Sequence, residues 1–269
     1  MCPPGSASIP SSHLMSSKAP VAKERLDRLL VSQGLSTSRE IAVRTILAGG
    51  VRVDGTVVDK PARLVPRGAR IEIERPAPFV SRSGEKLAAA LDAFSIDSRG
   101  RVGLDVGCST GGFTDCLLQR GIKRVYAVDV GYGLIDWKLR QDSRVILLER
   151  TNIRYMDRSL IPEPIDLAVI DVSFISLKLV LPSVVPLLCE DAHVIALVKP
   201  QFEVGKGQVG AGGIVRDDAQ RRAVTERVIE CAAGLGLHHT GTFDSPMKGR
   251  KGNREILVSF LRRGIIASS

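Results

Sequence analysis

The chain has 269 residues, 44% of them hydrophobic, which is enough to bury one α/β core and to leave room for a small second domain. Its formal net charge of +9 favours a polyanionic partner. Five cysteines without a C-x-x-C or Cys/His cluster argue against a metal site and against a disulfide framework. Because no apolar run reaches the length of a membrane span and no signal-peptide pattern opens the chain, we expect a cytoplasmic protein that does not enter a membrane.

The N-terminal part divides into a segment without a folding pattern and a small unit with one. Residues 1–20 are rich in Ser and Pro and are predicted to be disordered. Residues 21 to about 76 are predicted to form two short helices followed by a small, twisted β element. In the first helix, Leu26, Leu29 and Leu30 share one face.

The second helix is predicted to open on the capping box Thr37-Ser-Arg-Glu40. Its inward side is predicted to carry Ile41, Thr45, Ile46 and Leu47. Short strands are then predicted at 51–53, 56–58 and 69–73.

Four motifs in this unit resemble the S4-like RNA-binding domain over about fifty residues: Ser38-Arg-Glu-Ile-Ala-Val-Arg44, Gly50-Val-Arg-Val-Asp-Gly55, Lys60-Pro61 and Val65-Pro-Arg-Gly68. Arg39 and Arg44 are predicted on the exposed side of the second helix, where guanidinium groups can grip RNA phosphates. The alternative is a solvated basic face without a partner. The predicted RNA-binding patch is extended by Arg52, Lys60, Arg63 and Arg67.

The remainder of the chain alternates strand and helix patterns. Two prolines in Arg75-Pro-Ala-Pro-Phe-Val80 predict a linker at 77–80, so that 81–269 form the second domain. Strands are predicted at 102–106, 125–130, 145–148, 166–171, 193–198, about 239–243 and 255–261. The clearest helices are predicted at 176–188 and 217–234. This order predicts an α/β, doubly wound, Rossmann-like sheet that is mostly parallel and binds ligands at the carboxyl ends of its strands.

The stretch from Gly103 to Phe113 reads as a buried strand, a loop of small residues and the start of a helix. Ser109 stands where a dinucleotide fingerprint has its second glycine, and no P-loop pattern is present at this loop, so S-adenosylmethionine is favoured over NAD. Asp105 is predicted to face the amino-acid end of that cofactor. Asp129 ends the next strand and is predicted to bind the ribose hydroxyls, although both acids can also serve only as loop caps. The other predicted cofactor contacts are Gly107, Cys108, Ser109, Thr110, Gly111, Gly112, Phe113 and, for the adenine, Asn152.

Two further strands end in charged residues, Asp171 and Lys199. Both are expected to face the cofactor crevice, because the carboxyl ends of parallel strands meet at one edge of a sheet. The structural interpretation is a salt bridge between them. The functional interpretation adds that a partly desolvated lysine can lose its charge and accept a proton.

Seven motifs, correctly ordered along the chain, resemble the TlyA family, also called haemolysin A: Ser81-Arg-Ser-Gly-Glu-Lys-Leu87, Asp105-Val-Gly-Cys-Ser-Thr-Gly-Gly-Phe113, Asp129-Val-Gly-Tyr-Gly133, Leu148-Glu-Arg-Thr-Asn152, Asp171-Val-Ser-Phe-Ile-Ser-Leu177, Lys199-Pro-Gln-Phe-Glu-Val-Gly-Lys-Gly-Gln208 and Gly252-Asn-Arg-Glu255. The family comprises S4-domain ribosomal RNA 2′-O-methyltransferases with an FtsJ/RrmJ-like catalytic domain. With the N-terminal unit, the resemblance covers residues 21 to about 262. Ser83 departs from the glycine that the first motif leads us to expect.

The resemblance implies a catalytic tetrad of Lys86, Asp171, Lys199 and Glu255, which transfers a methyl group to the ribose of a cytidine in ribosomal RNA without a metal. Lys199 is our candidate to take or orient the hydroxyl proton, with Asp171 positioning it. Only 14 residues follow Glu255, and this short tail favours the large ribosomal subunit over the small one. The alternatives are a catalytically inactive RNA-binding factor and a cytolysin.

The last basic segments are expected to contact RNA beside the tetrad. Lys206 lies in a glycine-rich loop, 205–213, that suits either a lid over RNA or a plain flexible connection. Lys248, Arg250 and Lys251 suit a phosphate-binding rim near Glu255. The protein is expected to act as a monomer, since it must lie against a ribosomal particle.

Overall fold

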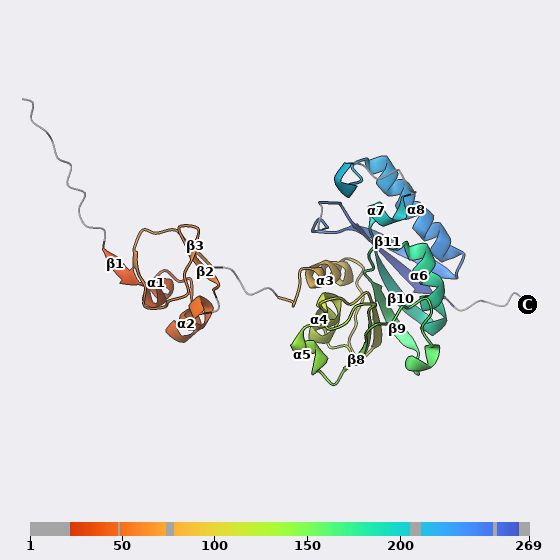
Figure 1. Ribbon diagram of the computed structural model, residues 1–269, viewed down its shortest axis with the longest axis horizontal. Helices are drawn as coiled ribbons and strands as arrows, with labels where there is room; N and C mark the ends of the chain where they lie inside the picture. The colour runs from red at the N-terminus through yellow and green to blue at the C-terminus, as the bar shows by residue number, and fades with distance from the viewer. Residues whose placement is uncertain (1–21, 48, 74–77, 205–210, 250–251, 264–269) are drawn as a thin grey trace, which may run out of the picture. The chain divides into compact units, whose positions relative to one another are not determined.

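The computed structural model describes residues 22–47, 49–73, 78–204, 211–249 and 252–263. The chain divides into two compact units, and the boundary between them lies between residues 76 and 77 (Figure 1). The predicted disorder of residues 1–20 lies outside the described residues.

The N-terminal unit packs two short helices against short antiparallel strands. Its elements are β1 (Lys23–Arg25), α1 (Leu26–Ser32), α2 (Arg39–Leu47), β2 (Val51–Val53), β3 (Thr56–Val57), β4 (Leu64–Pro66) and β5 (Ile71–Ile73). β2 lies between β3 and β5, and β1 pairs with β4. Leu26, Leu29 and Leu30 are buried together, which confirms the predicted inner face of the first helix.

The predictions for α2 were wrong in two details. The helix begins at Arg39, and its cap is Ser38, whose Oγ accepts a hydrogen bond of 3.2 Å from the amide of Ile41. Ile41 and Leu47 are 40% and 63% exposed, so only Ala42 and Ile46 face the core. A short helix that packs on the core with one narrow face buries residues four positions apart, here Ala42 and Ile46, and leaves the residues beside them exposed to solvent.

Strands β1 and β4 were not predicted. Each has three residues, and they pair over three positions that are distant in the sequence. A strand of that length is too short to show a two-residue hydrophobic period.

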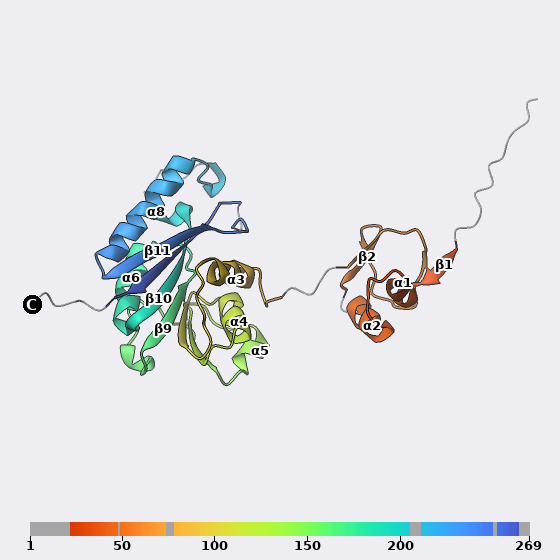
Figure 2. The same ribbon diagram turned by 180° about the vertical axis from the view of Figure 1, so that it is seen from behind.

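The second unit is a seven-stranded sheet covered on both faces (Figures 1 and 2). The strands are β6 (Val102–Val106), β7 (Arg124–Val128), β8 (Val145–Leu148), β9 (Ile165–Ile170), β10 (Leu188–Val198), β11 (Leu237–Asp244) and β12 (Ile256–Arg262). Their order is β11-β12-β10-β9-β6-β7-β8. β12 runs antiparallel to both of its neighbours and the other described pairings are parallel, as the predicted mostly parallel sheet requires.

The helices of this unit form two layers. Their bounds are α3 (Ser83–Ala93), α4 (Gly112–Gln119), α5 (Trp137–Arg140), α6 (Leu177–Val184), α7 (Pro200–Glu203) and α8 (Asp218–Ala233), with short 3-10 turns at Arg158–Leu160, Val185–Leu187 and Ala211–Gly213. The apolar residues of α3 and α4 pack on one face of the sheet, and those of α6 and α8 on the other.

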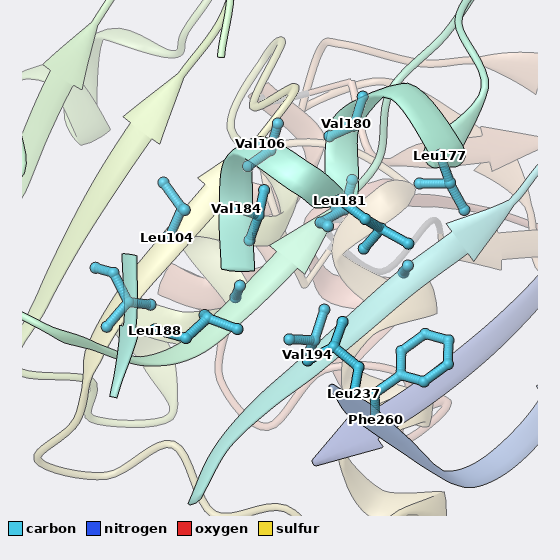
Figure 3. Close-up of a cluster of buried hydrophobic side chains, with 14 of the residues drawn as sticks. Leu104, Val106, Leu177, Val180, Leu181, Val184, Leu188, Val194, Leu237 and Phe260 are labelled. Carbon is cyan, nitrogen blue, oxygen red and sulfur yellow. The ribbon is translucent and has the colours of Figure 1, made fainter. Parts of the chain in front are cut away.

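Figure 3 shows the layer beneath α6, where Val180, Leu181 and Val184 face Leu104 and Val106 of β6. Alternate residues of β6 point to opposite faces. Asp105, between those two, therefore faces the α4 side, where Thr114 contacts it. Because Leu104 and Val106 face the α6 layer, the carboxyl group of Asp105 must lie on the α4 side of the sheet.

The segment before α3 is anchored on the second unit, although residues 77–80 were predicted as a linker. The amide of Val80 donates to Asp115 Oδ2 at 2.8 Å, and Gln119 Nε2 donates to the carbonyl of Pro78 at 2.8 Å. The ring of Phe79 packs against the α3–α4 layer. Residues 78–80 therefore belong to the folded second unit.

The predicted helix at 176–188 is shorter than expected. α6 contains Pro182 and ends at Val184, a 3-10 turn carries Pro186, and β10 already begins at Leu188. Each proline lacks an amide hydrogen, so α-helical hydrogen bonding stops here. The pattern of apolar residues nevertheless continues, which is why the sequence predicted a longer helix.

In the N-terminal unit, Asp27 is fully buried and accepts hydrogen bonds from Arg25 at 3.0 Å and from Arg39 at 2.9 Å. The bond from Arg25 is the main cause that lowers the pKa of Asp27 from 3.8 to about 2. A depressed folded pKa stabilises the fold above pH 3.8, and this contribution is lost as the pH falls through about 2.

We therefore expect Asp27→Asn to destabilise the N-terminal unit near neutral pH by an amount on the order of 1–2 kcal/mol, since both arginines are partly open to solvent. The difference from the wild type should shrink as the pH falls below the ordinary pKa of 3.8. Thermal unfolding of both proteins across this pH range measures it. A difference that stays constant with pH would refute the assignment of the stabilisation to the charged form of Asp27.

Candidate active site

The loop after β6 has a backbone that glycine makes possible. Gly107 and Gly111 have φ angles of +85° and +92°. A Cβ atom on Gly107 would lie 2.6 Å from the carbonyl oxygen of Asp171, and one on Gly111 would lie 2.3 Å from the Leu139 side chain. The loop is therefore pressed against the ends of its neighbours, and a ligand can approach its backbone without meeting large side chains.

Asp129 joins this loop to the one after β7. Its Oδ2 accepts the amide of Ser109 at 2.8 Å, and its Oδ1 accepts the amide of Gly131 at 2.7 Å. A carboxylate oxygen can accept more than one hydrogen bond, so both oxygens retain capacity for hydroxyl groups. Asp129 lies just beyond β7, in the position that the sequence predicted for a ribose-binding acid.

Asp105 is more enclosed than the sequence suggested. Its side chain is completely buried, and Thr114 Oγ1 donates to its Oδ2 at 2.7 Å. Its Oδ1 is buried and has no hydrogen-bond partner among the described residues. Burial raises the pKa of this carboxyl to about 7. The orphaned oxygen, the glycine cradle and the acceptors of Asp129 fit a cofactor with a cationic end and a ribose.

The side chains of the other predicted cofactor residues lie in three settings. Those of Cys108 and Phe113 belong to the α3–α4 core, so these two residues can reach a ligand only through their backbone. Ser109 and Thr110 are exposed on the loop, and Gly112 packs against the hydroxyls of Ser81 and Ser83.

Asn152 is exposed in the turn that follows β8, next to the predicted cofactor loop. The amide of Thr151 donates to the carbonyl of Asp129 at 2.9 Å, which holds this turn beside the loop after β7. Asn152 Oδ1 accepts the amide of Arg154 at 3.1 Å, so its Nδ2 is the side available to an adenine.

The four predicted tetrad residues form two ion pairs. Lys199 Nζ lies 2.6 Å from Asp171 Oδ1, which confirms the predicted salt bridge, and Lys86 Nζ lies 2.5 Å from Glu255 Oε2. Lys86 comes from α3, and the other three residues lie immediately beyond the ends of β9, β10 and β12. We refer to these four residues as the charge cluster.

The sheet register explains why the two pairs are neighbours. Val198 of β10 is paired with Ile256 of β12 in an antiparallel ladder. The next residues outward are Lys199 and Glu255, which therefore lie across from each other. Both ion pairs are largely buried, and each charge has an opposite charge in contact, which offsets the cost of removing it from water.

Three residues beside the charge cluster were not predicted as site residues. Ser173 Oγ accepts a hydrogen bond of 2.9 Å from Lys199 Nζ. Phe174 is 91% exposed, has a φ of +64°, and its ring centroid lies 5.0 Å from that of Phe202. The sequence does show that Ser173 and Phe174 follow directly after Asp171 at the end of a strand. It does not show their contacts, because loop residues have no periodic pattern that indicates where their side chains point.

The predicted RNA-binding residues are only partly free of internal contacts. Arg39 is engaged with Asp27, and Arg67 pairs with Glu24 at 3.1 Å. Arg52 is half-buried and donates to the carbonyl of Gly55 at 3.4 Å. The predicted residues Arg44, Lys60, Arg63 and Lys248 are exposed. Lys206, Arg250 and Lys251 lie outside the described residues.

Within the residues that the structure describes, no group of three or more His, Cys, Asp or Glu side chains is placed to hold a metal ion. No helix in the same part of the chain is long and apolar enough to cross a membrane.

Comparison with known proteins defines the class to which this site belongs. Residues 79–262 match the FtsJ-like methyltransferase family, and residues 24–71 match the S4 domain. The chain therefore belongs to the FtsJ-like methyltransferases and carries an S4 domain at its N-terminal side.

Individual relatives narrow the class further. The chain is 47% identical to the 16S/23S rRNA (cytidine-2′-O)-methyltransferase TlyA of Mycobacterium tuberculosis over 88% of this chain and 89% of that protein. It is 40% identical to Hemolysin A of Brachyspira hyodysenteriae, over 88% and 99% of the two chains. A solved structure from Streptococcus thermophilus that carries a hemolysin name is 42% identical, covers 90% of each chain and superposes with a TM-score of 0.69. These relatives confirm the resemblance to TlyA.

The buried carboxyl of Asp105 gives a pH-dependent prediction. Its folded pKa of about 7 lies above the ordinary 3.8, so between these values the folded state binds the proton more strongly than the unfolded state does. Stability should therefore fall as the pH rises through this interval. The side chain of Asp105→Asn cannot ionise, so the free energy of unfolding of this variant should increase relative to that of the wild type as the pH rises from about 5 to about 8.

Urea unfolding of the two proteins at both pH values measures this effect, with Asp97→Asn, at an exposed carboxylate, as the control. A difference between wild type and Asp105→Asn that does not change with pH would show that Asp105 ionises as an ordinary carboxyl group.

Proposed function

We propose that this protein transfers the methyl group of S-adenosylmethionine to the ribose 2′-oxygen of a cytidine in ribosomal RNA, with the large subunit as the favoured target. The observation that carries the proposal is the charge cluster: two lysines and two acids paired at the carboxyl edge of the sheet, beside a glycine loop suited to a nucleoside cofactor. The names of the similar proteins and the S4 domain support the RNA substrate.

The cofactor supplies a methyl group on a positively charged sulfur, and the residues of this chain supply binding and proton handling. Asp129 is proposed to accept hydrogen bonds from the ribose hydroxyls of the cofactor. The loop from Gly107 to Phe113 is proposed to contact the cofactor through backbone atoms. Asp105 is proposed to face the ammonium group of the cofactor with its Oδ1, which has no hydrogen-bond partner among the described residues. Asn152 is proposed to bond the adenine.

Lys199 is proposed to take or orient the proton of the substrate hydroxyl, because that hydroxyl is a weak nucleophile while it keeps its proton. Asp171 and Ser173 contact Lys199 Nζ from two sides and fix its direction. Lys86 and Glu255 are proposed to hold the ribose from the α3 side.

The N-terminal unit, residues 21–76, is proposed to bind folded RNA through Arg39, Arg44, Arg52, Lys60, Arg63 and Arg67. The catalytic unit, 81–269, is proposed to add Lys206, Lys248, Arg250 and Lys251 as phosphate contacts. We further propose that the protein works as a monomer in the cytoplasm and uses no metal. A monomer suits an enzyme whose substrate is a ribosomal particle.

The test is transfer of labelled methyl groups to 50S, 30S and 70S particles from cells that lack the modification, followed by mapping of ribose methylation. We expect label on a cytidine ribose of the large subunit. Lys199→Ala should transfer none while binding S-adenosylhomocysteine nearly as well as the wild type does. Label in DNA, protein or lipid would overturn the proposal, and binding to ribosomes without transfer would identify an inactive RNA-binding factor.

Phe174 provides a second test of the RNA substrate. A bulky residue with positive φ is strained, and an aromatic ring so exposed gains little from the protein, which suggests a ligand as its partner. We propose that a nucleobase stacks on it. Because stacking contributes about 1–3 kcal/mol per base, Phe174→Ala should lower kcat/KM for RNA about 5- to 150-fold.

Phe174→Tyr should retain most of the activity, and cofactor affinity should be unchanged in both variants. Leu179→Ala, at another exposed apolar residue on α6, is the matched control and should behave as wild type. Equal kcat/KM for wild type and Phe174→Ala would exclude stacking on this ring.

A further inference from the structure

The loops that carry Asp171 and Lys199 are joined by Glu203, a residue with no part in the mechanism above. Glu203 is the last residue of α7, which begins directly after Lys199. Its Oε2 accepts the hydroxyl of Ser176 at 2.6 Å, and its Oε1 accepts the amide of Leu177 at 2.8 Å. Ser176 and Leu177 form the start of α6, which follows the Asp171 loop.

These bonds place a carboxylate on the N-terminus of α6, where amides lack partners within the helix. A negative charge is favoured there by the helix dipole. Ser176 Oγ also accepts the amide of Lys178 at 3.2 Å, so its hydroxyl hydrogen is free to be donated to Glu203. The two oxygens of Glu203 therefore satisfy two separate donors of one helix start.

The two segments touch at three successive levels. The first is the ion pair of Asp171 with Lys199, together with the bond from Lys199 to Ser173. The second is the contact of Phe174 with Phe202. The third is the pair of bonds from Ser176 and Leu177 to Glu203. At each level, a residue of 171–177 meets a residue of 199–203.

At the third level, both carboxylate oxygens of Glu203 accept short hydrogen bonds, from Ser176 and Leu177, and bonds to a charged group are strong and directional. The second is a single tilted aromatic contact, and the first contains the groups that must act on the substrate. We infer that Glu203 is a positioning residue: by tying α7 to the start of α6, it fixes the separation and direction of Asp171 and Lys199. This inference rests on the proposed function of that pair.

Such a residue acts on rate more than on binding. It touches neither the glycine loop nor Asp129, so its loss should leave cofactor affinity unchanged. A displacement of about 1 Å at the reacting groups can lower a rate by about 100-fold. We therefore expect Glu203→Ala to lower the single-turnover rate of methyl transfer about 10- to 100-fold, with the Kd for S-adenosylhomocysteine within about twofold of wild type.

Glu203→Gln retains an acceptor oxygen in a side chain of the same shape and should recover a large part of the rate lost in Glu203→Ala. Ser176→Ala removes one of the two bonds and should have an intermediate effect. These two variants keep the test decisive if Glu203→Ala does not fold, since each alters the contact with little change in volume.

Asp217→Ala is the matched control. Asp217 also caps a helix, α8, through a bond of 2.9 Å from the amide of Ala219 to its carboxylate, but it contacts neither segment of the charge cluster. Its loss should cost stability without changing the single-turnover rate. A purely structural role for Glu203 predicts that both alanine variants lose stability and keep their rates.

Crystal structures of wild type and Glu203→Gln or Glu203→Ala provide a readout independent of activity. We expect the Asp171–Lys199 contact of 2.6 Å to lengthen in Glu203→Ala and to change less in Glu203→Gln. An unchanged rate or an unchanged contact in Glu203→Ala, or in Ser176→Ala where Glu203→Ala does not fold, would overturn the inference. Failure of the wild type to methylate ribosomal RNA would instead refute the proposed function, and the crystallographic comparison would still decide whether Glu203 positions the pair.

Discussion

The catalytic unit depends on the way Asp171 is shared between two loops. Its amide donates to the carbonyl of Val106 at 2.9 Å, and its own carbonyl oxygen lies so close to Gly107 that a Cβ atom there would clash. Its side chain pairs with Lys199. One residue therefore connects the predicted cofactor loop with the predicted proton-handling lysine.

Charge balance is the second constraint on the site. Four ionisable side chains meet at the end of a sheet whose strands are otherwise apolar, and such a cluster is tolerable only if opposite charges touch. The antiparallel β12 makes this possible, because its reversed direction brings its first residues to the edge where the parallel strands end. Glu255 can then lie beside Lys199 while Lys86 reaches it from α3. In the N-terminal unit, the buried carboxylate of Asp27 is likewise in contact with opposite charge, from two partly exposed arginines.

Much of the second unit could be predicted from the sequence because its signals are local. Apolar runs gave the strands of the sheet, and the acids and lysine at their ends marked its ligand-binding edge. The salt bridge between Asp171 and Lys199 followed from parallel topology alone. The weak predictions concerned short elements: β1 and β4 are too brief for a period, and the cap of α2 was displaced by one residue. Prolines in α6 likewise hid a helix end within a continuous apolar pattern.

By itself, the sequence indicated the order of the strands along the chain, the glycine-rich loop and the charged strand ends at Asp171 and Lys199, because each depends on residue type and spacing. Lys86 and Glu255 were added by the resemblance to the TlyA family. The tertiary structure decided which charges touch. It showed that Lys86 pairs with Glu255, 169 positions away, that Asp105 is enclosed, and that Glu203 caps a helix from a neighbouring loop. These contacts join segments distant in the sequence, and their geometry arises only when the sheet register and the packing of both helix layers are in place.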